Sequence, residues 1–136
     1  MKRKLIRTLI VLVVLILIYD FNFRPKTVTY LGEDANWSIK INSKLVGFNG
    51  SYSIKVRYKG NKSIEYVDFN IHPPHYEVGI PSMKEKGFYH WECKDDCGFY
   101  DKEDELLFFI VWKEDNRSEE KMRFINLKKI PTNWWK

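Results

Sequence analysis

An apolar run near the N-terminus constrains this chain more than any other feature. Leu9 to Ile18 contains no polar side chain, and a cationic stretch over residues 2–7 precedes it. A helix of such residues is apolar on all sides and needs burial on all sides. Because positive side chains resist translocation, this order of charge and apolar run is typical of a segment whose N-terminus stays in the cytoplasm. It predicts a membrane anchor over residues 1–23 and a short linker over residues 24–26.

The length of the run leaves alternatives to a spanning anchor open. Leu5 to Tyr19 makes about 22 Å of helix at 1.5 Å per residue, whereas a bilayer core is about 30 Å thick. A cleaved signal peptide is one alternative, although Ile16 to Lys26 lacks the small residues that cleavage requires. A buried helix of a soluble protein is the other. For a single-pass anchor with an extracytoplasmic domain, the side chains expected to meet lipid include Leu5, Leu9, Val11, Leu15, Ile18 and Tyr19.

The excess of positive charge belongs to this N-terminal part. The whole chain of 136 residues carries a net charge of +5, with 23 basic and 18 acidic side chains. Residues 1–26 hold six of the basic groups and one of the acidic groups, so residues 27–136 hold 17 of each. Net charge therefore gives no support to nucleic acid as a partner of the domain.

The remaining chain alternates like β-strands. Tyr52, Ile54, Val56 and Tyr58 face one way between polar residues, which is the period of a half-buried strand. Turn residues at 59–62 predict a hairpin over residues 51–71, with a bulge near Tyr66, where the phase slips.

Further strand signals cover the rest of the domain. Residues 106–112 are continuously apolar and predict a central strand covered on both faces, paired with residues 121–127 across the turn at 114–118. Other strands are expected over residues 27–30, 37–41 and 76–80. A further strand is expected to begin at residue 88 and to continue through Trp91 to the cysteine pair. About seven to eight strands without an amphipathic helix favour an all-β, immunoglobulin-like antiparallel β-sandwich over residues 27–127, followed by a Trp-rich tail over residues 128–136.

Cys93 and Cys97 are the two cysteines of the chain. On the predicted topology both lie outside the membrane, where thiols tend to be oxidised, so we expect a disulfide between them. A metal site that adds His90 to the two thiolates is an alternative. A redox pair is another, although redox motifs place two residues, not three, between the cysteines.

Other candidate sites are weaker. His72 and His75 flank two prolines, which tend to send the imidazoles apart, so a loop without a metal is the preferred interpretation. The acidic stretch at 101–105 suggests calcium or a solvated loop, and it lacks the alternation of a calcium loop. No nucleophile elbow, phosphate loop or zinc motif is present, so we expect no catalytic residues and no cofactor.

Trp134 and Trp135 stand between lysines near the end of the chain. They suit packing on the open end of the sandwich, contact with a membrane interface, or binding of a partner. The three possibilities stay open.

Residues 31–37, Leu-Gly-Glu-Asp-Ala-Asn-Trp, follow the anchor closely. With that anchor, the segment resembles one found in small uncharacterised extracytoplasmic proteins of bacilli and related Gram-positive bacteria. The resemblance rests on Gly32, Glu33, Asn36 and Trp37. It implies a cell-surface location and a β-sandwich, and it supplies no activity. We expect Trp37 to anchor the core and Gly32 to relieve a turn.

These observations favour a membrane-anchored interaction or accessory domain at the bacterial cell surface. The expected partners are the lipid bilayer, through the N-terminal helix, and a protein or envelope polymer. A membrane-tethered thiol-redox or hydrolytic enzyme and a protective, immunity-type envelope protein are the alternatives.

Overall fold

The structure is a computed structural model, and it describes residues 2–72, 77–80, 87–95, 97–98, 103–115 and 119–131. Within these residues a single helix, α1 (Lys2–Phe23), precedes eight strands. The strands are β1 (Lys26–Glu33), β2 (Trp37–Val46), β3 (Asn49–Tyr58), β4 (Ile64–His72), β5 (Glu77–Ile80), β6 (Phe88–Cys93), β7 (Glu105–Glu114) and β8 (Lys121–Ile130).

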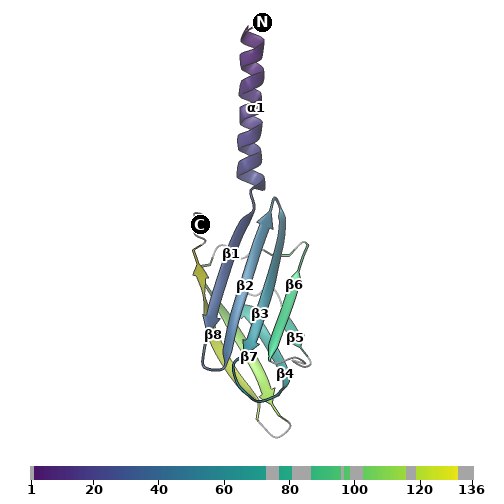
Figure 1. Cartoon of the computed structure of the whole chain (residues 1–136), viewed down its shortest axis with the longest axis vertical. Coiled ribbons are helices and arrows are strands. Elements are labelled where there is room, and N and C mark those ends of the chain that lie inside the picture. The colour runs from purple at the N-terminus through teal and green to yellow at the C-terminus, as the bar shows by residue number, and fades with distance from the viewer. Residues whose placement is uncertain are drawn as a thin grey trace.

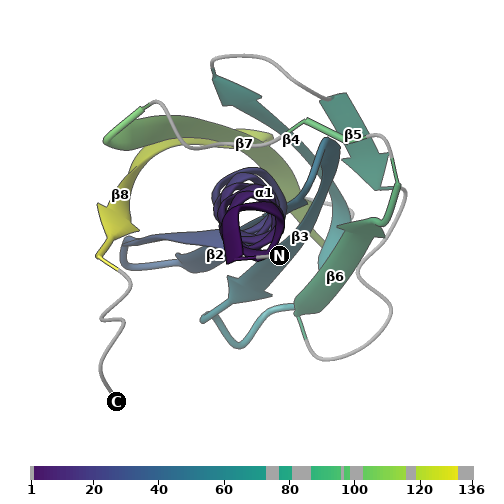
Figure 2. The same ribbon diagram turned by 90° about the horizontal axis from the view of Figure 1, so that it is seen from above.

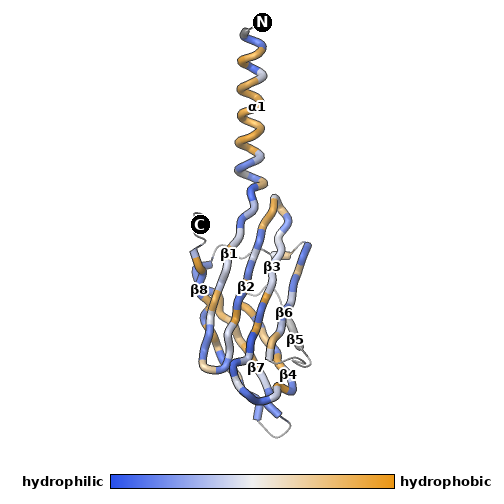
Figure 3. The backbone as a smooth tube through the Cα atoms, in the orientation of Figure 1, coloured by the Kyte–Doolittle hydropathy of each residue, from blue (hydrophilic) through white to orange (hydrophobic). Residues whose placement is uncertain are grey.

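The helix α1 projects away from the sheet (Figure 1). Its apolar side chains are exposed on every side, from 43% for Phe23 to 72% for Leu5, and apolar residues follow its middle turns (Figure 3). The predicted helix is therefore present. The predicted alternative of a helix buried by its own domain is wrong, because the strands do not cover it.

In the parts of the chain described above, no helix is both long and apolar enough to cross a membrane. The prediction that residues 1–23 form a transmembrane helix is thus not supported. The physical reason is that Arg7 and Asp20 bound the purely apolar part of α1. What remains between them is short against a bilayer core of about 30 Å.

The eight strands form one antiparallel sheet in the order β5-β4-β7-β8-β1-β2-β3-β6. Seen from above, the sheet curls beneath α1 so that its edge strands β5 and β6 approach each other (Figure 2). The predicted antiparallel β architecture is confirmed, but the two separate sheets of an immunoglobulin-like sandwich are not found. Alternation along a strand shows that one face is buried. It does not show whether the buried faces belong to two sheets or to one curled sheet.

The core lies inside the curl. Trp37, the first residue of β2, is fully buried there, and its ring contacts Trp112 of β7 edge-on at 5.5 Å between centroids and Tyr58 of β3 at 5.0 Å. Phe69 of β4 reaches Tyr89 of β6 at 6.1 Å, which links strands near opposite edges of the sheet. The expectation that Trp37 anchors the core is confirmed. Its fully buried companions with the largest side chains include Tyr30, Phe108, Ile39, Ile41, Ile54, Ile71, Leu106, Ile110 and Leu127.

Most of the predicted strands are found. β7 is a central strand, and β8 pairs with it from Glu105↔Lys128 to Trp112↔Lys121, as expected. The register of β4 against β7 shifts between Ile64 and Tyr66, which is the predicted bulge. β8 continues to Ile130 and so includes the first residues of the predicted tail.

The predicted hairpin over residues 51–71 is wrong. β3 pairs with β2 and β6, whereas β4 pairs with β5 and β7. Residues 59–63 therefore cross from one half of the curled sheet to the other. A period of two in each strand is compatible with either arrangement, because it carries no information about the neighbouring strand.

The segment behind the resemblance is a structural turn between β1 and β2. The Asp34 carboxylate accepts hydrogen bonds from the backbone N–H groups of Asn36 at 2.8 Å and Trp37 at 2.7 Å. Gly32, however, lies in β1 before the turn. A Cβ there would lie 2.6 Å from the carbonyl oxygen of Asn126. Its expected role in the turn is thus corrected: the glycine permits close packing of β1 on β8.

Candidate functional site

The outer face of β1, β2, β3 and β6 carries rows of polar side chains. Because successive side chains of a strand point to opposite faces, the buried Ile39 and Ile41 of β2 leave Lys40 and Asn42 on the outside. In β3 the same alternation buries Ile54 and exposes the polar residues on either side of it. The core sequence thus decides which residues form this outer face.

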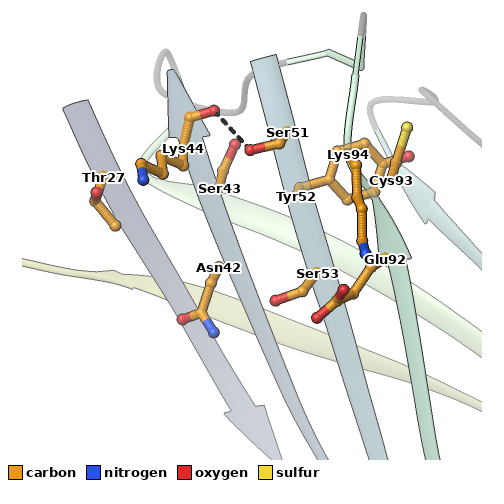
Figure 4. Close-up of a pocket in the computed structure, with 10 residues that line it drawn as sticks. All are labelled: Thr27, Asn42, Ser43, Lys44, Ser51, Tyr52, Ser53, Glu92, Cys93 and Lys94. Atoms are coloured by element: carbon orange, nitrogen blue, oxygen red, sulfur yellow. Dashed lines mark hydrogen bonds between the residues drawn. The ribbon is translucent and has the colours of Figure 1, made fainter. Parts of the chain in front are cut away.

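A hollow of about 330 Å³ opens on this face. We call it the polar hollow, and Figure 4 shows its lining. Ser51 donates a hydrogen bond from Oγ to the backbone carbonyl of Lys44 at 3.5 Å. Asn42, Ser53 and Glu92 lie on neighbouring strands in register, so an amide, a hydroxyl and a carboxylate form one row. The lining comprises Thr27, Asn42, Ser43, Lys44, Ser51, Tyr52, Ser53, Glu92, Cys93 and Lys94.

Lysines border the polar hollow. Lys44 and Lys94 are part of its lining, and Lys40 and Lys55 lie next to it as direct cross-strand partners. We call Lys40 and Lys55 the lysine row. Like charges directly opposite each other destabilise a sheet. Among ion pairs between described residues, none joins these four lysines to a carboxylate.

His90 continues the lysine row on β6, where it pairs with Lys55 in register. Its Nε2 lies 3.1 Å from the Glu92 carboxylate, and both side chains are partly exposed. His72 ends β4, which is not a neighbour of β6 in the sheet, and His75 lies outside the described residues. Within the described residues no three His, Cys, Asp or Glu side chains gather as a metal site would require.

Cys93 and Cys97 lie at disulfide distance, with their Cα atoms 6.0 Å apart. The backbone N–H of Cys97 donates to the carbonyl of Gly50 at 3.0 Å, so the bridged loop is fastened to the start of β3. Because Cys93 also lines the polar hollow, the bridge supports one wall of it. Neither described cysteine is free. Of the three uses left open for the pair, this arrangement supports the disulfide.

A buried carboxylate joins the ends of three strands. Glu114 of β7 is 3% exposed and accepts hydrogen bonds from the Tyr58 hydroxyl at 2.8 Å and Lys121 Nζ at 2.8 Å. Lys62 Nζ lies 3.0 Å away. The bond from Lys121 is the main cause that lowers the pKa of Glu114 to about 2, against an opposing effect of burial. Burial and the bond to Glu114 raise the pKa of Tyr58 to about 12. A carboxylate so stabilised is a poor proton acceptor, and its role is structural.

The outer face of β7 and β8 is apolar instead. Phe109 and Phe124 are cross-strand partners with ring centroids 4.8 Å apart, and Phe124 and Met122 are 65% and 62% exposed. The prediction that residues 106–112 are covered on both faces is therefore wrong for the outer face. The continuous apolar sequence of β7 indicated that a layer of the protein covers its outer face. Instead, β8 continues this face with the exposed apolar side chains of Met122 and Phe124.

No protein-family model, curated protein or solved structure matches the chain. The function must therefore be argued from the site itself.

Sequence reasoning missed the polar hollow and the lysine row. The alternation in β3 places Ser51, Ser53 and Lys55 on one face, which was visible in the sequence. To predict that Lys40 pairs with Lys55, one must know the register of β2 against β3. The short turn at 47–48 sets that register and is the sequence signal that could have revealed the pair. The predicted tail residues Trp134 and Trp135 and the acidic residue Asp101 lie outside the described residues.

Proposed function

We propose that this chain is a membrane-attached, extracytoplasmic binding domain without a catalytic role. One observation carries the proposal: α1 is apolar on every side, and no described part of the chain covers it. Such a helix is stable only where its surroundings are apolar too. A lipid bilayer supplies them, and the charged ends of Lys4 and Arg7 can extend to the headgroups, which compensates for the short apolar run. The cationic residues 2–7 favour the cytoplasmic side for the N-terminus.

The junction between α1 and the sheet supports attachment to lipid. Phe23 ends the helix and contacts Phe48 edge-on at 6.4 Å between ring centroids. Phe48 belongs to the turn between β2 and β3 and is 92% exposed. Exposed aromatic rings beside an apolar helix suit the level of the lipid headgroups. The turn and the helix end thus form one apolar surface.

Two features of the sheet support the rest of the proposal. The cysteines at disulfide distance suit an oxidising compartment, which an extracytoplasmic location supplies. The polar hollow and the unpaired lysines beside it suit binding, because folding alone does not require like charges to face each other. We place the ligand on this outer face.

Val13→Lys tests the attachment. The change puts a charge in the middle of the apolar run, which costs about 3 kcal/mol in a bilayer, so the full chain should shift from the membrane fraction to the soluble fraction. The control is Asn126→Lys, which adds the same charge on the exposed face of β8. Equal membrane fractions for both variants would refute attachment through α1.

Protease treatment of intact cells tests the orientation. We expect the sheet domain to be cut from outside, with its cysteines resistant to thiol-reactive labels until a reductant is added. Protection of the domain in intact cells, with cleavage only after permeabilisation, would refute the extracytoplasmic placement. Reactive thiols in untreated protein would instead favour the thiol-redox alternative.

A second candidate function is protein binding through the outer face of β7 and β8. It is favoured by the exposure of Phe124 and Met122 beside Phe109, since exposed aromatic and methionine side chains are typical of protein interfaces. Phe124→Ser should abolish the recovery of a protein crosslinked to the wild-type chain in membranes. Unchanged recovery would exclude this face as the contact.

A further inference from the structure

The lysine row is placed at a cost in stability. The register of β2 on β3 puts Lys40 opposite Lys55, and that of β3 on β6 puts His90 opposite Lys55. On this face Glu92 is paired with His90, at 3.1 Å, and Glu33 with Lys59, at 3.0 Å. The two ammonium groups of the row therefore face solvent without a described anion. A ligand with negative charge would relieve the repulsion.

A second pair of lysines, Lys44 of β2 and Lys94 directly after β6, lies further along the same face. Lys44 follows Lys40 by four residues in β2, which corresponds to about 14 Å at 3.4 Å per residue. Lys44 lines the polar hollow together with Lys94. A single small anion bound at one lysine pair leaves the other pair without a counterion. A chain with anionic groups at intervals can contact both.

The surface between the two lysine pairs is rich in hydroxyl and amide groups. Asn42 and Ser53 occupy it, with Ser51 and Thr27 beside Lys44. Figure 4 shows these short side chains on neighbouring strands. They offer hydrogen-bond donors and acceptors to a hydroxylated unit. Tyr52, the aromatic residue of the lining, is buried, so the hollow lacks the exposed ring on which nucleobases stack.

We infer that the outer face of β1, β2, β3 and β6 binds a linear polyol-phosphate polymer. Lys40 and Lys55 contact one phosphodiester, Lys44 and Lys94 contact another, and the polar hollow holds the hydroxylated unit between them. This inference rests on the proposed binding function and names its ligand class. The strands run away from the end that carries α1 (Figure 1), so the polymer lies along the domain and not in the plane of the bilayer.

Binding of a synthetic poly(glycerol phosphate) oligomer to the full chain in zwitterionic detergent tests the inference. We expect the affinity to fall about tenfold in Lys40→Gln with Lys55→Gln, and similarly in Lys44→Gln with Lys94→Gln. The wild-type affinity should fall as salt rises, because phosphate contacts release counterions. The matched control is Lys113→Gln with Arg123→Gln, which removes two charges from β7 and β8, away from β2, β3 and β6, and should bind like the wild type.

Thermal unfolding separates lost contacts from lost folding. Lys40→Gln with Lys55→Gln removes the repulsion within the row, so its Tm should equal or exceed that of the wild type while its binding weakens. A lowered Tm together with lost binding would overturn the assigned role of the row.

Four further ligands test the chemical class of the bound polymer. A neutral dextran oligomer should not bind, and inorganic phosphate should bind far more weakly than the polymer. Equal or tighter binding of single-stranded DNA of matched charge, or of vesicles with anionic lipid, would overturn the polyol-phosphate assignment. Absence of binding to the polymer would overturn it too, and it would leave the membrane-attachment test with Val13→Lys unaffected.

Discussion

At the scale of single residues, the buried carboxylate of Glu114 makes folding stability depend on pH. Its pKa is lowered to about 2 in the folded chain, so folding favours the charged form. The stability that it contributes is complete above the ordinary value of 4.5 and is lost as the pH falls towards 2. Glu114→Gln should lower the free energy of unfolding at pH 7 by about 2 kcal/mol and flatten this acid dependence. Chemical denaturation between pH 2 and pH 7 measures both effects.

Glu105→Gln is the control for Glu114→Gln, since Glu105 is an exposed carboxylate of the same strand. It should retain the acid dependence of the wild type. The same flattening in both variants would contradict the role of the buried carboxylate.

Gly32 shows how one missing side chain sets the spacing of two strands. A Cβ at this position would meet Leu127 Cδ2 at 2.5 Å as well as the Asn126 carbonyl, and a backbone carbonyl cannot move aside cheaply. Gly32→Ala should therefore destabilise the fold by about 1–3 kcal/mol, measured by thermal or urea unfolding. Leu31→Ala, at an exposed position of β1, should have a much smaller effect. A neutral Gly32→Ala would mean that β8 shifts freely, contrary to the close packing described.

At the scale of elements, the bridged loop after β6 braces the start of β3. Replacing Cys93 and Cys97 by Ser should lower the free energy of unfolding by about 2 kcal/mol, the chain-entropy value for so short a loop. Reductant should lower the Tm of the wild type and leave that of the variant unchanged. A reductant effect of equal size on both proteins would show that the bridge is not its cause.

The strands themselves were largely predictable, because the alternation in β2 and β3 follows directly from which side chains are buried, and β7 was marked by its continuous apolar run. The candidate site was not predictable in the same way. Lys40 and Lys55 each look like an ordinary solvent-facing residue, and their meaning appears only when the register places them side by side. The polar hollow depends on four strands at once, whereas sequence patterns describe one strand at a time.

At the scale of the whole molecule, the order of the sheet escaped prediction for a related reason. The turn after Tyr58 looks like a hairpin turn, yet β4 continues on the other half of the curl. Contacts such as Trp37 with Trp112 and Phe69 with Tyr89 join distant parts of the sequence and close the curl. The local sequence pattern does not encode these contacts. One curled sheet and two stacked sheets bury the same alternating residues, so the pattern cannot distinguish them.

The pairing of β1 with β8 bears on how the domain is made. Thr29 to Leu31 pair with Lys128 to Ile130, so the first strand of the domain lies beside its last. Strands so distant along the chain pair late, because a long loop must close first. β1 therefore has one edge open until β8 is in place. During that interval the open edge can pair with a strand of another chain, so aggregation competes with folding until the two strands meet.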